Sequence, residues 1–291
     1  MIKDGIIIVN KPAGISSFKV CETVKKRLKA KKVGHGGTLD PFAKGLMIVG
    51  INKGTRLLPF FIDANKEYKG KIILGEMRDS FDITGEIVGT KDFSHVESSM
   101  IYEAANRFIG AIKQKPPIFS AIKHKGKPLY KYARKGIAIE KEERFVFIEK
   151  FDILNIELPE IEFYIKCSKG TYIRSIANDF GISLKTFAYL SELERIGIGE
   201  FKLKDAAELD SVEYSDIIDF ENVFNFKKFY VKEEFLNIFE NGNPLLPEYL
   251  ENFTYNDKYF YVISKNCVAI SEFIKEEGII KIKVLHKKTL H

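Results

Sequence analysis

Runs of apolar residues along the chain predict short strands interleaved with helices. Gly5–Val9 and Leu46–Ile51 are such runs, and we expect both to be strands, the second of them buried. The same reasoning predicts a short helix near 55–61, strands at 68–75 and 162–168, and helices within 95–109 and at 174–180. Arg174 therefore stands at a strand-to-helix junction, where side chains tend to project into sites rather than cores.

The first helix is expected to run from Ser16 or Ser17, either of which can cap it, to about Ala30. Apolar residues recur in it at three- and four-residue spacing, so the expected buried stripe is Phe18, Cys21, Val24 and Leu28. Lysines fill the remaining positions, and this helix should present a basic face to solvent.

The segment 114–136 is punctuated by proline and glycine, and lysines alternate in it with Phe119, Tyr130 and Tyr132. This composition predicts a long loop with one short helix near 129–134. Cations interleaved with aromatic rings suit RNA, because phosphates take the charge and bases stack on the rings. Long loops in compact domains are usually functional or disordered, so we expect a mobile arm that becomes ordered on its ligand.

After Phe226 the pattern changes to short apolar runs around a turn at 241–244. These runs predict strands at 235–239, 259–263, 268–272 and 279–285, which together make a small all-β module. We expect two domains, 1–225 and 226–291. The alternative is that the late strands extend the first sheet.

Charge is clustered along the chain. Lysine and arginine outnumber aspartate and glutamate by 46 to 40. Seven cations stand between 19 and 32 against one acid, and eight stand between 111 and 136 with none. Two such clusters indicate a polyanion partner, foremost nucleic acid. A lysine-rich solvated surface is the alternative.

Several kinds of protein are excluded by the remaining composition. The three cysteines and five histidines are scattered without metal-ligand spacing, which indicates buried thiols in a reducing cytosol and no metal site. The sequence lacks the long apolar run of a signal peptide or a membrane span. We therefore expect a cytoplasmic protein with no membrane association.

The candidate reactive group is Asp40, at the end of the glycine-rich loop 34–41. The pair Gly36-Gly37 permits turns closed to other residues and lets a ligand approach the backbone, while Pro41 holds Asp40 in an extended geometry. Taken alone, the loop fits a surface turn better than a reactive site. Other parts of the sequence reverse that preference.

Five blocks of residues, in order, resemble the TruB family of bacterial tRNA pseudouridine-55 synthases over roughly residues 5–210. The blocks are Asn10–Ser17, Gly34–Pro41, Lys66–Tyr68, the motif residues within 117–134, and Cys167–Arg174. The resemblance implies an α+β fold, with a pseudouridine-synthase core of a mixed, mainly antiparallel sheet, flanking helices and an RNA-binding loop insertion at about 117–145. The tail resembles a PUA-type RNA-binding domain.

The resemblance also implies isomerisation of uridine 55 in the tRNA T-loop to pseudouridine. It implies that Asp40 is the nucleophile and that Tyr68 and Arg174 belong to the active site. The substrate-pocket positions of the family correspond to His35, Tyr172 and Leu193. Lys11 is a further candidate that could contact substrate or brace the loop of Asp40. A bidentate contact from Arg174 would keep the buried carboxylate of Asp40 ionised and correctly oriented.

Each of these residues also has a plainer interpretation. Outside the family context Arg174 fits a phosphate contact or a surface ion pair, and Tyr68 fits an ordinary strand aromatic. A lone loop histidine such as His35 is more often structural, and Tyr172 and Leu193 fit core packing almost as well as pocket walls. Glu194 and Arg78 stand at positions where the family pattern has other residues.

Isomerisation transfers no electrons, so we expect no cofactor. The implied partner is the T-arm of tRNA, and we expect a monomer that needs no protein partner. Two alternatives remain open at this point. The protein could be a tRNA-folding chaperone that binds the T-arm, or the catalytic subunit of a guide-RNA-dependent pseudouridine synthase.

Overall fold

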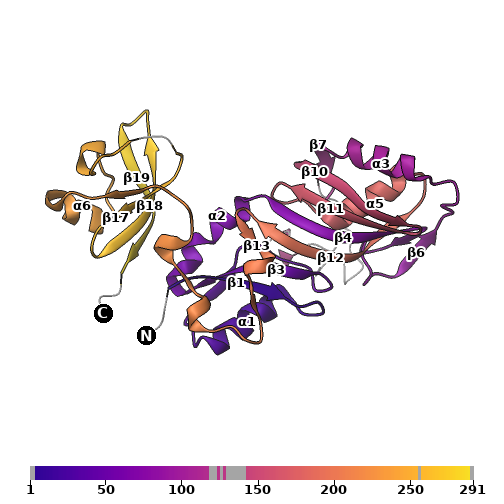
Figure 1. The fold of residues 1–291 in the computed structure, drawn as a ribbon, viewed down its shortest axis with the longest axis horizontal. Coiled ribbons are helices and arrows are strands. Elements are labelled where there is room, and N and C mark those ends of the chain that lie inside the picture. Colours follow the sequence, from indigo (N-terminus) through magenta and orange to yellow (C-terminus); the bar gives the residue numbers. More distant parts are fainter. Residues whose placement is uncertain (1–3, 118–122, 125–126, 129–141, 255–256, 289–291) are drawn as a thin grey trace.

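Two β-sheets organise the chain (Figure 1). The computed structural model describes residues 4–117, 123–124, 127–128, 142–254 and 257–288. The main strands of the larger sheet are β1 (Gly5–Lys11), β3 (Lys44–Ile51), β4 (Lys66–Leu74), β7 (Gly110–Gln114), β10 (Arg144–Glu157), β11 (Glu160–Cys167), β12 (Ala188–Ile198) and β14 (Ala207–Glu208). They lie in the order β14-β1-β3-β12-β4-β11-β10-β7.

Three short strands complete this eleven-stranded sheet: β2 (Val33–His35), β13 (Phe201–Lys202) and β15 (Ile218–Asp219). Pairs β1/β14 and β3/β12 are parallel and the others are antiparallel, so the sheet is mixed and mainly antiparallel, as expected. Two small hairpins lie outside it, β5 (Glu76–Arg78) with β6 (Ile87–Thr90), and β8 (Lys123–His124) with β9 (Lys127–Pro128).

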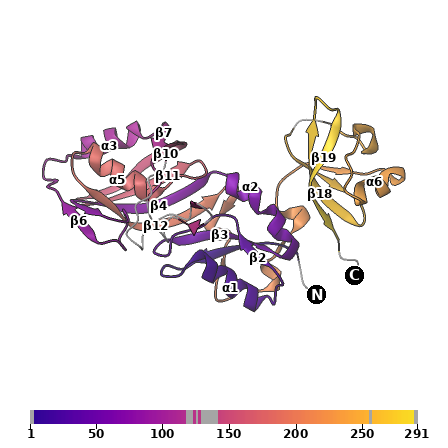
Figure 2. The same ribbon diagram turned by 180° about the vertical axis from the view of Figure 1, so that it is seen from behind.

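Helices flank the large sheet in two groups, visible from both sides in Figures 1 and 2. Helix α1 (Ser17–Arg27) covers β1 and β3, burying Val20 and Val24 against Ile7 and Val49. Helices α3 (Ser98–Arg107) and α5 (Ile173–Ser183) cover the other half of the sheet. The 3-10 helix η1 (Asn52–Leu57) and helix α2 (Leu58–Asp63) follow β3.

The buried stripe of α1 differs from the prediction in one residue. Ser16 caps the helix by accepting a hydrogen bond from the Lys19 amide at 3.1 Å. The face toward the core carries Ser17, Val20 and Cys21, so Phe18 points away from it and is 69% exposed. The prediction that Phe18 is buried was therefore wrong.

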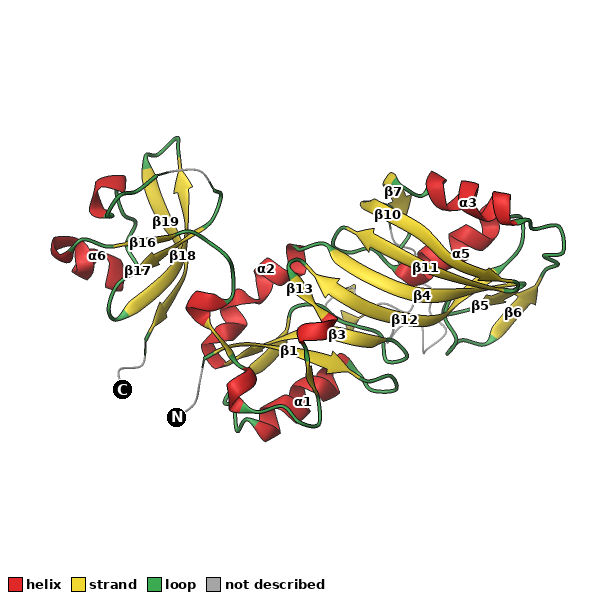
Figure 3. Ribbon diagram, viewed as in Figure 1, coloured by secondary structure: helices red, strands yellow, loops and turns green. Residues whose placement is uncertain are grey.

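Several other segments differ from the sequence-based expectations. No element was assigned to the stretches that form β10 and β12. Residues 235–239 were expected to form a strand, but helix α6 (Leu236–Glu240) occupies this segment (Figure 3). The expected helix at 129–134 and most of the predicted RNA-binding arm at 117–145, with Phe119, Tyr130 and Tyr132, lie outside the described residues.

The smaller sheet is separate from the larger one, so the late strands do not extend it. It consists of β16 (Lys228–Tyr230), β17 (Phe260–Ile263), β18 (Cys267–Ile274) and β19 (Ile279–Lys287). A small C-terminal four-stranded sheet of this kind is consistent with a PUA-like domain. The domain boundary near residue 225 stays a prediction.

A hydrophobic core joins the two sheets. Phe61 and Phe220 from the first part of the chain share one buried cluster with Tyr261 and Ile270 of the smaller sheet. The Tyr261 hydroxyl donates a hydrogen bond to the Phe220 carbonyl at 2.9 Å, and the ring of His286 stacks on that of Phe220 with centroids 5.1 Å apart. The smaller sheet is thus packed against the larger one.

Candidate active site

A cavity of about 370 Å³ brings together most of the predicted site residues. Its walls come from the loop after β2, from β4, from the start of α5 and from β12. Of the seven candidates, those that line it are Asp40, Tyr68, Tyr172, Arg174 and Leu193. His35 and Lys11 lie outside this lining.

Arg174 donates hydrogen bonds from two nitrogens to the carboxylate of Asp40. Its Nε donates to Oδ2 at 2.9 Å and its Nη2 donates to Oδ1 at 3.3 Å. The Arg174 side chain is 4% exposed, whereas that of Asp40 is 34% exposed and opens to the cavity. This two-pronged geometry fixes the orientation of the carboxylate and leaves it accessible to a ligand.

The same guanidinium also faces a second carboxylate, which the sequence analysis missed. Arg174 Nη1 donates to the Ser80 carbonyl at 3.0 Å and lies 3.4 Å from Asp82 Oδ2. The Ser80 hydroxyl and the Thr84 amide and hydroxyl hold Asp82 Oδ1. Arg174 is therefore fixed between a buried structural carboxylate and the accessible one.

Burial and charge act in opposite directions on Asp40. Burial raises the pKa of its carboxyl above the usual value, and the nearby Asp82 adds to that effect. The Arg174 fork and, more weakly, Lys11 lower the pKa and so favour the ionised form. The ionised form of Asp40 thus depends on Arg174.

The backbone of the loop that carries Asp40 is held at successive residues. Arg195 donates to the carbonyls of Gly37 at 3.2 Å and Thr38 at 3.4 Å. The hydroxyl of Ser17, in the first turn of α1, accepts from the Leu39 amide at 2.9 Å and donates to the Leu39 carbonyl at 2.8 Å.

On the far side of Asp40, the carbonyl of Pro41 accepts from the Gly14 amide at 2.8 Å and from Lys11 Nζ at 3.2 Å. Lys11 Nζ also donates to the carbonyls of Pro12 and Ile15. The Lys11 side chain is fully buried, and burial lowers its pKa to about 8. The geometry fits the bracing role, and direct substrate contact by Lys11 stays untested.

Tyr68 and Arg195 face each other across paired strands. They are register partners on β4 and β12, and both line the cavity. Arg195 is 1% exposed and also donates to the Leu46 carbonyl at 2.8 Å. Burial raises the pKa of Tyr68 to about 12, although Arg195 opposes this, so the phenol is protonated at neutral pH and can donate a hydrogen bond.

The remaining candidates are held by backbone or ring contacts. The Gln114 side chain accepts from the Tyr172 amide at 2.8 Å and donates to the Tyr172 carbonyl at 3.0 Å, and Arg144 lies 4.9 Å over the Tyr172 ring. Leu193 is a buried wall residue of the cavity. His35, on β2, has a pKa lowered by burial, so it is neutral near pH 7.

Two residues that depart from the family pattern have partners within the protein. Arg78 donates to the carbonyls of Ile83 and Gly85 and lies 4.3 Å over the ring of Tyr189. Glu194 lies 3.7 Å from Lys44, a surface ion pair. Lys66, another residue that the sequence analysis did not single out as a site residue, lines the cavity and donates to the carbonyls of Phe61, Ile62 and Ala64.

Within the described ranges, no group of three or more His, Cys, Asp or Glu side chains is arranged to hold a metal ion. None of the helices in that part of the chain is long and apolar enough to cross a membrane.

Comparison with known proteins identifies the family. The model for TruB family pseudouridylate synthase (N terminal domain) matches residues 25–173. The tRNA pseudouridine synthase B of Clostridium kluyveri is 35% identical over 264 residues, covering 89% of this chain and 91% of that protein. The chain belongs to the TruB family of pseudouridylate synthases. As a TruB-family protein it is an enzyme, an isomerase, and the resemblance seen in its motifs is confirmed.

A second TruB relative supports the family, and two solved structures show the same fold. The tRNA pseudouridine synthase B of Opitutus terrae is 42% identical over 210 residues, or 72% of this chain and 87% of that protein. A Cbf5-Nop10-Gar1 complex contains a chain with a TM-score of 0.71 and 24% identity, covering 99% of this chain and 85% of that one. An H/ACA RNP bound to a substrate RNA gives a TM-score of 0.69 at 23% identity, covering 100% and 86%. These structures confirm the α+β pseudouridine-synthase fold.

Proposed function

We propose that this protein converts the uridine at position 55 of the tRNA T-loop into pseudouridine, with Asp40 as the nucleophile. The observation that carries the proposal is the accessible Asp40 carboxylate, held by Arg174 in the wall of a cavity. The relatives are named tRNA pseudouridine synthase B, which supports tRNA as the substrate.

The reaction exchanges one bond to the sugar for another. The bond from N1 of uracil to the sugar breaks, the base turns within the cavity, a bond from C5 to the same sugar carbon forms, and C5 loses a proton while N1 gains one. No electrons are gained or lost. Ionised Asp40 adds either to the base or to the sugar carbon in this sequence, and that bond breaks again before the product leaves, which returns the carboxylate that Arg174 favours.

The cavity has the features that a flipped nucleotide needs. A base stacked in folded RNA must leave its stack, at a cost of a few kcal/mol, and an aromatic ring can replace part of the lost stacking. Tyr68 is suited to stack on the base, with Tyr172 and Leu193 as further walls. The protonated phenol of Tyr68 is within the same cavity and is a candidate for proton transfer.

The test is tritium release from unmodified tRNA transcript labelled at uridine C5, with purified protein and no metal, guide RNA or partner. Wild type should release tritium, and release should stop when the T-loop uridine is replaced. Asp40→Asn should be inactive, because an amide is a poor nucleophile. Asp205→Asn, which changes an exposed aspartate outside the cavity, is the matched control and should retain activity.

Two other outcomes would contradict the proposal. Wild type that binds and refolds the transcript without releasing tritium would favour the chaperone role. Release that requires added guide RNA and partner proteins would favour the guide-dependent synthase.

A further inference from the structure

The outward face of α1 carries a group of cations around one exposed aromatic ring. We call it the α1 basic face and define it as Phe18, Lys19, Lys25, Lys26 and Lys29. All five are exposed. Positions 18, 22 and 25 recur at four- and three-residue intervals and so follow one side of the helix, opposite the side that packs on β1 and β3, and Lys29 follows directly after the helix end.

Most of these cations have no acidic partner. Lys19 lies 3.4 Å from Glu22, the single acid on this face. For Lys25, Lys26 and Lys29, no carboxylate of the described chain lies within ion-pair distance. Lysines in the last turn of a helix also interact favourably with its dipole. That effect accounts for Lys25 and Lys26, but not for Lys19 in the first turn or for Lys29 beyond the helix end.

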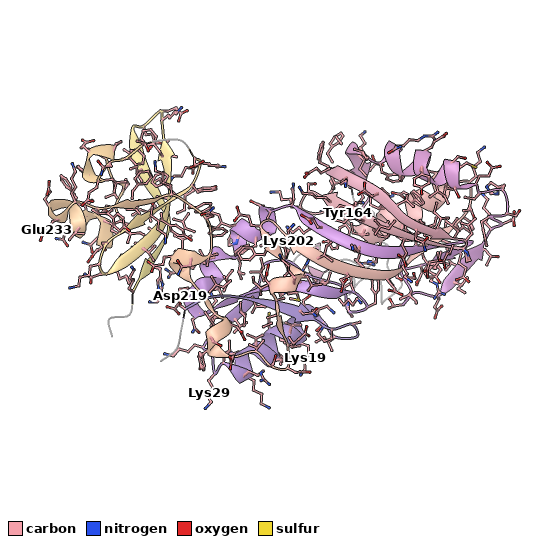
Figure 4. The ribbon with its side chains drawn as sticks, viewed as in Figure 1. Lys19, Lys29, Tyr164, Lys202, Asp219 and Glu233 are labelled. Atoms are coloured by element: carbon pink, nitrogen blue, oxygen red, sulfur yellow. The ribbon has the colours of Figure 1, made fainter. Side chains whose placement is uncertain are left out.

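The α1 basic face begins beside the catalytic loop. Ser17, the residue before Phe18, holds the amide and carbonyl of Leu39, which precedes Asp40. From there the helix extends for about 16 Å at 1.5 Å per residue. Figure 4 labels Lys19 and Lys29, which lie toward opposite ends of α1. The cations therefore lead from the edge of the active site outward along α1 and to the residue just past its C-cap.

We propose that the α1 basic face binds the substrate RNA on the side of the reacting nucleotide, with its lysines on backbone phosphates and Phe18 stacked on an unpaired base. An exposed aromatic ring among cations is a combination that suits single-stranded RNA, whose bases stack on the ring while its phosphates contact the cations. This inference rests on the proposed function, because it takes RNA as the substrate.

The test compares two variants with wild type and with a charge-matched control. Lys25→Gln/Lys26→Gln/Lys29→Gln removes three cations, and Phe18→Ala removes the ring. The control Lys91→Gln/Lys185→Gln/Lys204→Gln removes three exposed lysines on other elements. Tritium release from tRNA transcript gives kcat and KM, and filter binding of the same transcript gives Kd over a series of salt concentrations.

We expect Kd and KM of the triple α1 variant to rise at least tenfold near 0.1 M salt, with kcat unchanged. The slope of log Kd against log salt should fall by roughly 0.7–0.9 for every phosphate that a lysine no longer neutralises. Phe18→Ala should raise Kd roughly fivefold or more, with the slope retained, because stacking releases no counterions. The control should match wild type in both quantities.

An unchanged Kd and salt slope in the triple α1 variant would overturn the proposal. If its thermal midpoint alone fell, the lysines would serve only the helix dipole. Filter binding does not depend on turnover, so this result is separable from failure of the proposed activity, which would appear in wild type.

Discussion

Removing Arg174 should destabilise the protein, because this residue faces two carboxylates. In Arg174→Met, the Asp82 side chain, 5% exposed, would lose its cation, and the 34% exposed Asp40 would lose its fork. Breaking a buried ion pair from one side costs about 3–5 kcal/mol. Because Asp40 is partly solvated, we expect a loss near the lower end, about 3 kcal/mol. That is a large part of the roughly 5–15 kcal/mol that stabilises a typical domain.

Urea unfolding at neutral pH, followed by circular dichroism, measures this loss. Arg107→Met is the matched control, since its pair with Glu103 at 3.5 Å is exposed and should contribute less than about 1 kcal/mol. Adding Asp82→Asn to Arg174→Met should recover part of the stability, because it removes the uncompensated carboxylate. A loss within about 1 kcal/mol for Arg174→Met, or no recovery in the double variant, would refute the electrostatic reasoning.

The same residue should set the acid side of the pH profile. If Asp40 is the nucleophile, as proposed, activity requires its ionised form; burial raises its pKa, so kcat should fall as pH falls through that raised pKa. Loss of the Arg174 charge raises the pKa further, which moves the acid limb of the profile to higher pH. Arg174→Lys keeps the positive charge but loses the bidentate contact with Asp40. The acid limb of its pH profile should therefore move less, while kcat should drop about a hundredfold because the Asp40 carboxylate is misoriented. An acid limb at the wild-type position in Arg174→Met would contradict this account.

Three further changes test the support of the site. Ser17→Ala leaves the amide and carbonyl of Leu39 without partners and should cost about 2 kcal/mol in urea unfolding, with a lower kcat. The pKa of Lys66 is lowered by burial to about 8 from 10.5, so the unfolded state binds more protons between these values. Wild type should therefore gain stability over Lys66→Met as the pH of the urea titration rises from about 8 toward 10, and an unchanged difference would exclude a buried cation. A lysine at position 195 cannot reach the three carbonyls that Arg195 contacts, so Arg195→Lys should lower kcat and leave KM unchanged. A fall in kcat with an equal rise in KM would instead indicate general unfolding.

The sequence predicted the central contact of the site because that contact depends on residue type at motif positions. A carboxylate expected to act as a nucleophile needs a nearby cation, and Arg174 stood at a junction that projects side chains into sites. Asp82 was missed for the opposite reason. It lies in a loop with no periodic pattern, and its role follows from a three-dimensional approach to Arg174 at 3.4 Å.

Strand β12 was missed because it is irregular. Register shifts between Leu190 and Glu192, and between Arg195 and Gly197, break the two-residue alternation by which strands are recognised. The second shift lies beside Arg195, whose buried guanidinium then reaches the loop of Asp40. An arginine in such a stretch is expected to be exposed, so both the strand and the function of Arg195 needed the structure.

Phe18 and α6 show the limits of apolar spacing. Phe18 is three residues before Cys21, a spacing typical of a buried stripe, yet Ser17 occupies the inward position because its hydroxyl bonds Leu39. The run 235–239 is short and apolar, and such runs do not distinguish a strand from a helix. For Phe18, a tertiary contact of its neighbour decided the outcome.

The shared core between the two sheets has a consequence for the size of the RNA that the protein can accommodate. Since Phe61 and Phe220 are buried together with Tyr261 and Ile270, the C-terminal sheet cannot swing freely relative to the cavity. The distance between the C-terminal sheet and the cavity is then fixed. An RNA that touches both must carry a fixed number of base pairs between its reacting nucleotide and its second contact, so lengthening the stem by one pair should break one contact or the other.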